Sequence, residues 1–157
     1  MIRVGLGFDT HKLSSDRKLI LGSIPIEHPY GCAGHSDADV LIHAVCDALL
    51  GAANLRDIGF HFPDTEPKYK NINSLILLQE TNRLLIANQW KIENIDTTLV
   101  IQEPKIQPYI PQMQTALSQT LNLPADCISI KAKTSEKLGF IGRKEGVSAY
   151  AIALISK

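Results

Sequence analysis

One segment, residues 36–54, constrains the fold more than any other, because its polar and apolar side chains separate onto two faces of a helix. At 100° per residue, the polar residues Ser36, Asp39, His43 and Asp47 fall within about 80° of one another. The opposite arc is apolar and carries Val40, Ala44, Val45, Ala48, Leu49 and Ala52. This pattern predicts a helix that buries one face in the core. We expect Asp39 or Asp47 to hydrogen-bond the ring of His43 and fix its tautomer.

The same helix supplies one of three potential metal ligands. Asp9 and His11 stand two residues apart at the end of an N-terminal strand, so their side chains point to the same side. His43 on the helix can close over them. Three protein ligands with one open position are typical of a catalytic zinc site, because structural zinc sites normally have four. The residues alone leave an alternative open, in which Asp9 caps a turn and both histidines are ordinary surface side chains.

The rest of the chain alternates strands and helices. The first strand spans residues 2–8, and Gly5 and Gly7 let another segment approach its backbone. Further elements are a hairpin over 18–27, helices over 73–88 and 111–121, and strands over 92–102, 127–134 and 147–155. This order predicts one α/β domain over residues 1–157, with a mixed sheet and helices packed on one face. Covering the other sheet face with neighbouring copies would give a cyclic homo-oligomer.

Composition excludes several classes of protein. The formal net charge is zero, which argues against a nucleic-acid-binding protein that relies on a general basic field. No apolar run reaches membrane-spanning length, and no signal segment precedes the first strand. The chain has three cysteines and no C-x-x-C pair, so free thiols in a reducing compartment are the simpler interpretation. We therefore expect a cytoplasmic protein without membrane or nucleic-acid partners.

Two loops are candidates for ligand binding. Residues 56–65 form a loop rich in glycine, proline and aspartate that nevertheless carries Phe60 and Phe62. These rings are either plain packing or the wall of a pocket for a small organic substrate. The second loop, residues 135–146, is polar and punctuated by glycine.

Seven motifs occur in the chain in a fixed order. They are Gly7-Phe8-Asp9-x-His11, His35-Ser36-Asp37-x-Asp39-x3-His43, Asp47-Ala48-Leu49-Leu50-Gly51-Ala52-Ala53, Asp57-Ile58-Gly59, Phe62-Pro63-Asp64-Thr65, Pro104-Lys105 and Glu136-Lys137-Leu138-Gly139-Phe140-x-Gly142-Arg143-x-Glu145-Gly146. Through them the chain resembles the 2-C-methyl-D-erythritol 2,4-cyclodiphosphate synthases over essentially its whole length. Seven motifs in order are far more specific than any one of them.

The resemblance implies a reaction and an assembly. The family's substrate is 4-diphosphocytidyl-2-C-methyl-D-erythritol 2-phosphate, whose 2-phosphate attacks the β-phosphorus. The products are the cyclic diphosphate and CMP, in the non-mevalonate route to isoprenoid precursors. The family is homotrimeric, with an active site and a zinc-type ion at each subunit interface. A second divalent cation, magnesium or manganese, accompanies the diphosphate.

The resemblance also implies roles for individual residues. Asp9, His11 and His43 match the family's metal ligands, and His35 and Thr134 match residues that stabilise the transition state. Glu136 matches the residue associated with the second cation. Substrate contacts are implied for Asp9, Thr10, His11, His35, Ser36, Asp57, Ile58, Gly59, Phe62, Pro63, Asp64, Thr65, Glu66, Ile101, Gln102, Glu103, Pro104, Lys105, Ile106, Gln107, Lys133, Thr134, Ser135, Glu136, Phe140 and Arg143. Of these, residues 101–107 match a cytidine and diphosphate pocket that the neighbouring subunit contributes.

The chain departs from the family pattern at a few positions. Lys133 and Ser135 interrupt a run of threonines that is common in the family, and Glu103 and Gln107 stand where we expect small or apolar residues. Two other functions compete with the cyclising enzyme. A metal-dependent phosphohydrolase would use the same site to activate water, and a trimeric binding module would hold a precursor or a partner enzyme without turnover.

Overall fold

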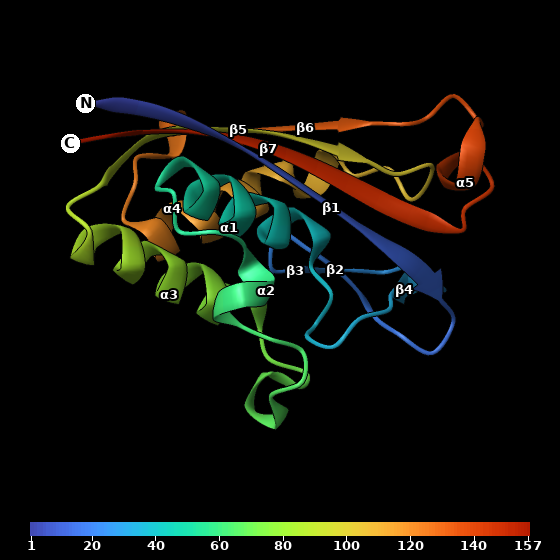
Figure 1. The fold of residues 1–157 in the computed structure, drawn as a ribbon. Helices are drawn as coiled ribbons and strands as arrows, with labels where there is room; N and C mark the ends of the chain where they lie inside the picture. Colours follow the sequence, from blue (N-terminus) through green and yellow to red (C-terminus); the bar gives the residue numbers. More distant parts are fainter.

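The computed structural model describes residues 1–157, and its centre is one helix that lies across two long strands. Helix α1 (Val40–Ala52) packs on β1 (Ile2–Ser14) and β7 (Gly146–Ser156), which pair antiparallel along most of their length (Figure 1). The helix is buried on nearly every side, and only its polar residues and Gly51 reach solvent. Because the helix is packed on nearly every side, its side chains are held in a fixed position relative to the sheet.

The main sheet has five strands in the order β4-β1-β7-β5-β6. Its remaining strands are β4 (Gly31–Cys32), β5 (Lys91–Val100) and β6 (Ile128–Lys133). Only β5 and β6 are parallel, and α4 (Ile110–Leu121) lies between them in the chain, as a parallel connection requires. A hairpin of β2 (Leu19–Leu21) and β3 (Ile24–Ile26) stands apart from the sheet. Helices α1, α3 (Ser74–Ala87) and α4 cover one face, which confirms the predicted fold class (Figure 1).

Two glycines let α1 approach the sheet closely. A Cβ atom at Gly7 would lie 1.8 Å from the carbonyl oxygen of Ala44, and one at Gly5 would lie 2.0 Å from that of Ala48. No side chain fits at such distances, so the helix backbone rests directly on β1. The prediction that these glycines admit another segment is confirmed.

The two faces of β1 differ sharply in their surroundings. Odd-numbered residues from Gly5 to Leu13 face the helices, whereas the even-numbered residues Ile2, Val4, Leu6 and Phe8 are exposed. Tyr150 and Ile152 on β7 extend this exposed apolar surface, and the Phe8 and Tyr150 rings lie 5.0 Å apart. The sheet therefore presents one uncovered apolar face, made of Ile2, Val4, Leu6, Phe8, Tyr150 and Ile152.

Several predicted boundaries were wrong. The first helix begins at Val40 rather than at Ser36, because Ala38 adopts a positive φ of 57° and Asp39 caps the helix. The first strand continues to Ser14 rather than ending at Phe8, because β7 pairs with it as far as Lys12. Two predicted loops contain short helices, α2 (Ile58–His61) and α5 (Gly139–Gly142). Single turns of 3₁₀ helix occur at Pro67–Tyr69, Gln107–Tyr109 and Ala125–Cys127.

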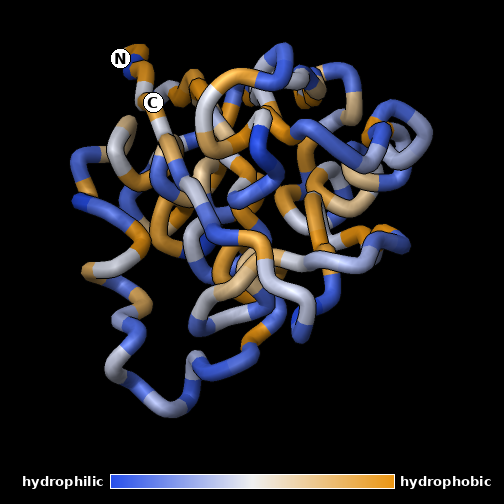
Figure 2. The backbone as a smooth tube through the Cα atoms, turned by 90° about the vertical axis from the view of Figure 1, so that its right-hand side faces the viewer, coloured by the Kyte–Doolittle hydropathy of each residue, from blue (hydrophilic) through white to orange (hydrophobic).

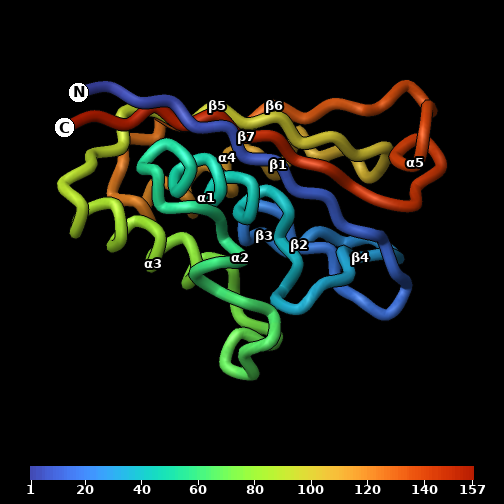
Figure 3. Tube along the Cα trace, in the orientation of Figure 1, coloured from blue at the N-terminus to red at the C-terminus, as the bar shows by residue number.

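Both chain ends lie at the same end of the paired strands β1 and β7. The backbone amide of Lys157 donates to the carbonyl of Met1 over 2.9 Å, and the two ends run side by side (Figure 3). The loop between α2 and α3 extends away from the helices and is mostly hydrophilic (Figures 2 and 3). None of the helices is long and apolar enough to cross a membrane.

Candidate metal centre and ligand cavities

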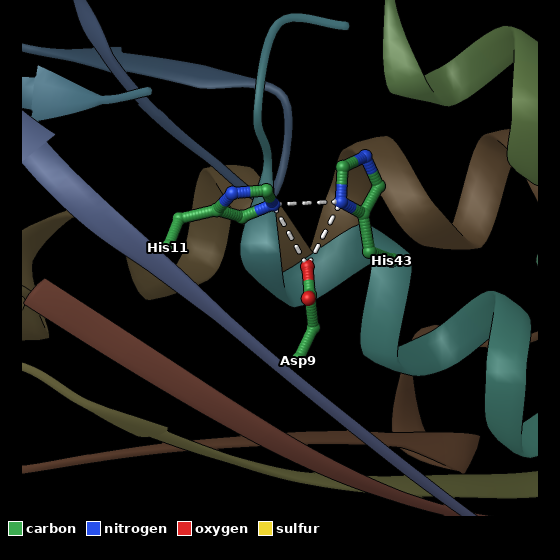
Figure 4. A group of neighbouring side chains, drawn as sticks. All are labelled: Asp9, His11 and His43. Atoms are coloured by element: carbon green, nitrogen blue, oxygen red, sulfur yellow. Dashed lines mark hydrogen bonds and ion pairs between the residues drawn. The ribbon is translucent and has the colours of Figure 1, made fainter. Parts of the chain in front are cut away.

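The three predicted metal ligands converge on one point. Asp9 and His11 alternate with β1 residues of the exposed face and so point toward α1, while His43 lies in the first turn of that helix (Figure 4). Asp9 Oδ2 is 2.9 Å from His43 Nδ1 and 3.0 Å from His11 Nε2, and the two ring nitrogens are 3.2 Å apart. Donor atoms around a tetrahedral zinc ion would be separated by about 3.3 Å. The triad thus has the spacing and the donor set of a zinc site.

The hydrogen bonding of His11 shows that this cluster suits a cation. His11 Nδ1 lies 2.9 Å from the carbonyl oxygen of Ala33, which can only accept, so Nδ1 carries the hydrogen. The other ring nitrogen, Nε2, then presents a lone pair to the carboxylate of Asp9 and to His43. Lone pairs this close repel one another unless a proton or a metal ion lies between them.

The pKa values of these groups follow from the same contacts. Burial alone would raise the pKa of Asp9, but hydrogen bonds and charge from His11 and His43 outweigh it and lower the pKa to about 2. Burial works to lower the pKa of His11, yet the hydrogen bond and charge of Asp9 raise it overall. A cation at the cluster replaces the proton that these interactions favour.

A cavity of about 350 Å³ opens beside the cluster. His11, His35, Ser36 and His43 line it together with Ile58, Gly59, Phe62, Pro63, Asp64, Tyr69, Ile72 and Leu77. His35 Nε2 is buried without a hydrogen-bond partner. Because buried polar atoms are nearly always paired, this nitrogen is available to a ligand. The structure thus brings together the predicted metal ligands, His35, Ser36 and much of the 56–65 loop.

Other residues of that loop have structural contacts instead. Asp57 caps α2, since its Oδ1 accepts from the backbone amide of Phe60 over 2.8 Å. Phe60 is exposed to solvent, and the guanidinium carbon of Arg56 lies 4.1 Å from the centre of its ring. Thr65 and Glu66 are exposed and do not line the cavity. Phe62, by contrast, lines the cavity and packs edge-on against Tyr69.

A second cavity of about 690 Å³ collects most of the predicted cytidine-site residues. Its lining consists of Ile101, Gln102, Pro104, Lys105, Ile106, Gln107, Ile110, Lys131, Ala132, Lys133 and Thr134. Glu103 is absent from the lining and instead pairs with Lys144 over 2.8 Å. Lys131 was not predicted from the sequence; it alternates with the buried Ile130 on β6 and also pairs with Asp96. The second cavity shares no lining residue with the first.

The loop between β6 and β7 borders a third, open hollow of about 550 Å³. Thr10, His11, Lys12, Phe140, Glu145 and Gly146 line it. Within the loop, Thr134 donates to the carboxylate of Glu136 over 2.9 Å, and Ser135 donates to the carbonyl of Leu138 over 2.7 Å. Arg143 pairs with Glu145 over 2.9 Å. Both of these charged side chains are solvent-exposed.

The prediction that Asp39 or Asp47 hydrogen-bonds the ring of His43 was wrong. Asp39 is fully buried and accepts from the backbone amides of Gly22, Ser23 and Ile42. Burial raises its pKa to about 6 against the opposing effect of these amides. Asp47 accepts from the amide of Ile58 over 2.7 Å, and burial raises its pKa. Both carboxylates therefore order backbone near the site without bonding the His43 ring.

Ser74 is the contact that the sequence analysis missed. Its hydroxyl lies 3.0 Å from His43 Nε2, and that of Ser36 lies 3.1 Å from the same nitrogen. Ser74 is the first residue of α3. No sequence spacing links it to residue 43, because the contact depends on how α3 packs against α1.

The fold and the site together define an α/β protein with a candidate metal triad and separate ligand cavities. The YgbB family model matches residues 2–156. A curated 2-C-methyl-D-erythritol 2,4-cyclodiphosphate synthase of Parabacteroides distasonis is 59% identical over 156 residues, which cover 99% of this chain and 97% of that protein. The corresponding synthase of Cytophaga hutchinsonii is 54% identical over the same share of this chain and 98% of its own length.

Solved structures agree with these relatives. The bifunctional IspDF of Campylobacter jejuni superposes with a TM-score of 0.95 at 41% identity over 99% of this chain, which spans 42% of that longer protein. The CDP complex of Plasmodium falciparum IspF gives a TM-score of 0.86 at 34% identity, covering 98% of this chain and 95% of that one. This chain belongs to the YgbB family, and its resemblance to the 2-C-methyl-D-erythritol 2,4-cyclodiphosphate synthases is confirmed.

Proposed function

We propose that this chain closes the ring of its diphosphate product beside a zinc ion held by Asp9, His11 and His43. The reaction converts 4-diphosphocytidyl-2-C-methyl-D-erythritol 2-phosphate into 2-C-methyl-D-erythritol 2,4-cyclodiphosphate and CMP, and the enzyme is a lyase. The observation that carries the proposed mechanism is the convergence of three donor atoms beside a cavity in which His35 Nε2 is unpaired.

The chemistry requires no nucleophile from the protein. An oxygen of the 2-phosphate attacks the β-phosphorus, and the bond from that phosphorus to the oxygen bridging to the α-phosphate breaks. CMP leaves with the bonding electrons on its phosphate. Both reacting groups belong to one substrate, so the chain has to fold that substrate into line and balance its charge. A bound metal ion supplies Lewis-acid polarisation of a phosphoryl oxygen.

The cavity of about 350 Å³ beside the metal triad, which we call the metal-side cavity, suits the methylerythritol part of the substrate. Ile58 and Phe62 supply apolar wall, and Asp64 and Ser36 supply polar groups for hydroxyls and phosphate. His35, protonated on Nε2, would donate to a phosphoryl oxygen whose negative charge grows in the transition state. Because His35 Nε2 has no hydrogen-bond partner within the protein, that hydrogen bond is free for the substrate.

The second cavity suits the cytidine diphosphate part. Lys105 and Lys133 bring positive charge to it, and Thr134 brings a hydroxyl. A solved 2C-methyl-D-erythritol-2,4-cyclodiphosphate synthase in its CDP-bound form, which matches 98% of this chain, supports a cytidine nucleotide as part of the substrate. We assign the second divalent cation, magnesium or manganese, to Glu136, whose exposed carboxylate lies within hydrogen-bond distance of Thr134. Phe140 and Arg143 on the same loop complete the proposed substrate contacts.

A homotrimer would join the two cavities. Within one chain they share no lining residue, yet one substrate has to reach both. The uncovered apolar sheet face, made of Ile2, Val4, Leu6, Phe8, Tyr150 and Ile152, would be buried between subunits. Each metal-side cavity would then face a second cavity contributed by a neighbour. The free thiols of Cys32, Cys46 and Cys127 suit a reducing compartment, and we place the enzyme in the cytoplasm.

Phosphorus NMR tests this function directly. Purified protein is incubated with the diphosphocytidyl substrate and magnesium, with and without a zinc chelator, and light scattering on the same sample gives its mass. We expect a cyclic diphosphate signal, stoichiometric CMP, loss of both after chelation, and a trimer mass. A linear phosphate product would replace the cyclase with a hydrolase. Tight binding of substrate by metal-loaded protein without CMP release would leave only a binding module.

A further inference from the structure

The ring of His43 is contacted from both of its nitrogens. Nδ1 faces Asp9 at 2.9 Å, whereas Nε2 lies 3.0 Å from the hydroxyl of Ser74 and 3.1 Å from that of Ser36. Ser74 is completely buried at the start of α3. A buried hydroxyl has few possible partners, so the direction of its hydrogen can be worked out from its neighbours.

Asp37 determines that direction. Its Oδ2 accepts from the backbone amide of Ser74 over 3.0 Å, and its Oδ1 accepts from the amide of Asp39 over 3.3 Å. Backbone amides only donate, so both oxygens of Asp37 are acceptors. The Ser74 hydroxyl, which also contacts Asp37 Oδ1, must therefore donate to it. With its only hydrogen committed to Asp37, the Ser74 oxygen can only accept from His43.

We infer that Asp37 and Ser74 are positioning residues that fix the tautomer of His43. The relay from Asp37 through Ser74 holds the hydrogen of His43 on Nε2, which leaves the lone pair of Nδ1 directed at Asp9 and His11. That lone pair is what a metal ion requires from a histidine ligand. The inference rests on the metal site of the proposed function and adds to it the part of the protein that prepares His43.

The surroundings make this relay rigid. The backbone amide of Asp37 donates to the carbonyl oxygen of Ile72 over 3.0 Å, and that of Asn71 donates to the carbonyl oxygen of His35 over 2.7 Å. These bonds tie the segment before α1 to the segment before α3. Ser36 accepts from the amide of Ala38 over 3.1 Å, which leaves the direction of its own hydroxyl hydrogen undetermined. Ser36 can therefore accept from His43 but does not by itself set the tautomer.

Two substitutions test the relay through the affinity for zinc. Ser74→Ala removes the acceptor, and we expect the zinc Kd to rise about 10-fold, at the lower end of the usual effect of such partners, because Ser36 can still accept from His43. Asp37→Asn should raise it by up to about 100-fold. The new side-chain oxygen would accept from the backbone amide of Ser74, so the NH₂ group would donate to the Ser74 hydroxyl oxygen. The hydroxyl hydrogen of Ser74 would then turn toward His43 and favour the tautomer with its hydrogen on Nδ1.

The measurement is zinc titration of metal-stripped full-length protein against a chromophoric chelator. The visible spectrum of the Co²⁺-substituted protein reports ligand geometry in parallel. Asn73→Ala is the matched control, since Asn73 caps the same helix through the amide of Leu75 without contacting His43. It should lower the thermal midpoint and leave both the zinc Kd and the cobalt spectrum as in the unsubstituted protein.

The possible outcomes separate the relay from the metal site itself. Weaker zinc binding in both relay variants, with normal binding in Asn73→Ala, supports the relay. If Ser74→Ala does not fold, Asp37→Asn decides alone. Unchanged zinc affinity in a folded relay variant would overturn the relay while leaving the metal site intact. Failure of the unsubstituted chain to bind zinc would overturn both the metal site and the relay.

Discussion

The close contact between α1 and β1 gives a sharp prediction for Gly7→Ala. The added Cβ would lie 1.8 Å from the carbonyl oxygen of Ala44 and 2.7 Å from the amide nitrogen of Ala48. Ordinary contact begins at 3.4 Å, so the helix and the strand must separate by roughly 1.6 Å. Overpacking a core usually costs about 1–3 kcal/mol. We expect a loss of about 3 kcal/mol, because backbone atoms cannot rotate out of the way.

The same substitution should weaken the metal site. His43 directly precedes Ala44 on the helix that has to move, whereas Asp9 and His11 stay on the strand. A shift of this size would take His43 Nδ1 out of its 2.9 Å contact with Asp9, and the zinc Kd should rise more than about tenfold. Urea unfolding at a fixed protomer concentration measures the stability, and chelator competition measures the affinity.

Gly51→Ala is the control for this experiment. Gly51 lies in the same helix, and nothing lies within 4 Å of the Cβ that it would gain. Alanine there should stabilise the protein by about 0.5–1 kcal/mol and leave zinc binding unchanged. A Gly7→Ala protein with normal stability and normal zinc affinity would refute the argument that this glycine sets the distance between helix and strand.

Three further predictions concern single side chains. His43→Ala should abolish zinc binding and turnover while leaving the proposed trimer assembled, as chelator competition and light scattering would show, since its side chain faces the cavity. In metal-free protein, the stabilising effect of Asp9 should be present above pH 3.8 and be lost as the pH falls to its pKa of about 2. The pKa of His11 is raised from 6.5, so its stabilising effect should be complete below pH 6.5 and be lost as the pH rises through the raised pKa. Urea titrations across this pH range, with Asp9→Asn as reference, would show the two trends. Asp39→Ala should cost about 3 kcal/mol in urea unfolding, because it leaves buried backbone amides of Gly22 and Ile42 without an acceptor.

The sequence predicted those features that depend on local periodicity. Asp9 and His11 follow the two-residue repeat of a strand, and His43 follows the repeat of a helix, so these three residues could be proposed as a metal site before any packing was known. The residues alone left an alternative open, and the family resemblance was needed to favour the metal site. The glycines at positions 5 and 7 indicated a close approach because they carry no side chain. Most of the residues expected to contact substrate do line cavities.

Features that depend on contacts between distant segments escaped prediction. The positive φ of Ala38 delays the first helix, so Asp39 caps it instead of lining the stripe with His43. Helices α2 and α5 have four residues each, too few to show a periodic pattern. Ser74 reaches His43 only because α3 packs beside α1, and nothing in the spacing of the two residues indicates it.

The placement of the three proposed metal ligands would link zinc supply to the lifetime of the folded protein. A metal ion bound there would join β1 to α1, two parts of the core whose ligands stand 34 and 32 residues apart along the chain. An unfolded chain offers no such set, so binding favours the native state by mass action. Free zinc at 100 times its Kd would add about 2.7 kcal/mol to the free energy of unfolding. Storage with a chelator should therefore shorten the time before the protein unfolds or is degraded, even when no substrate is present.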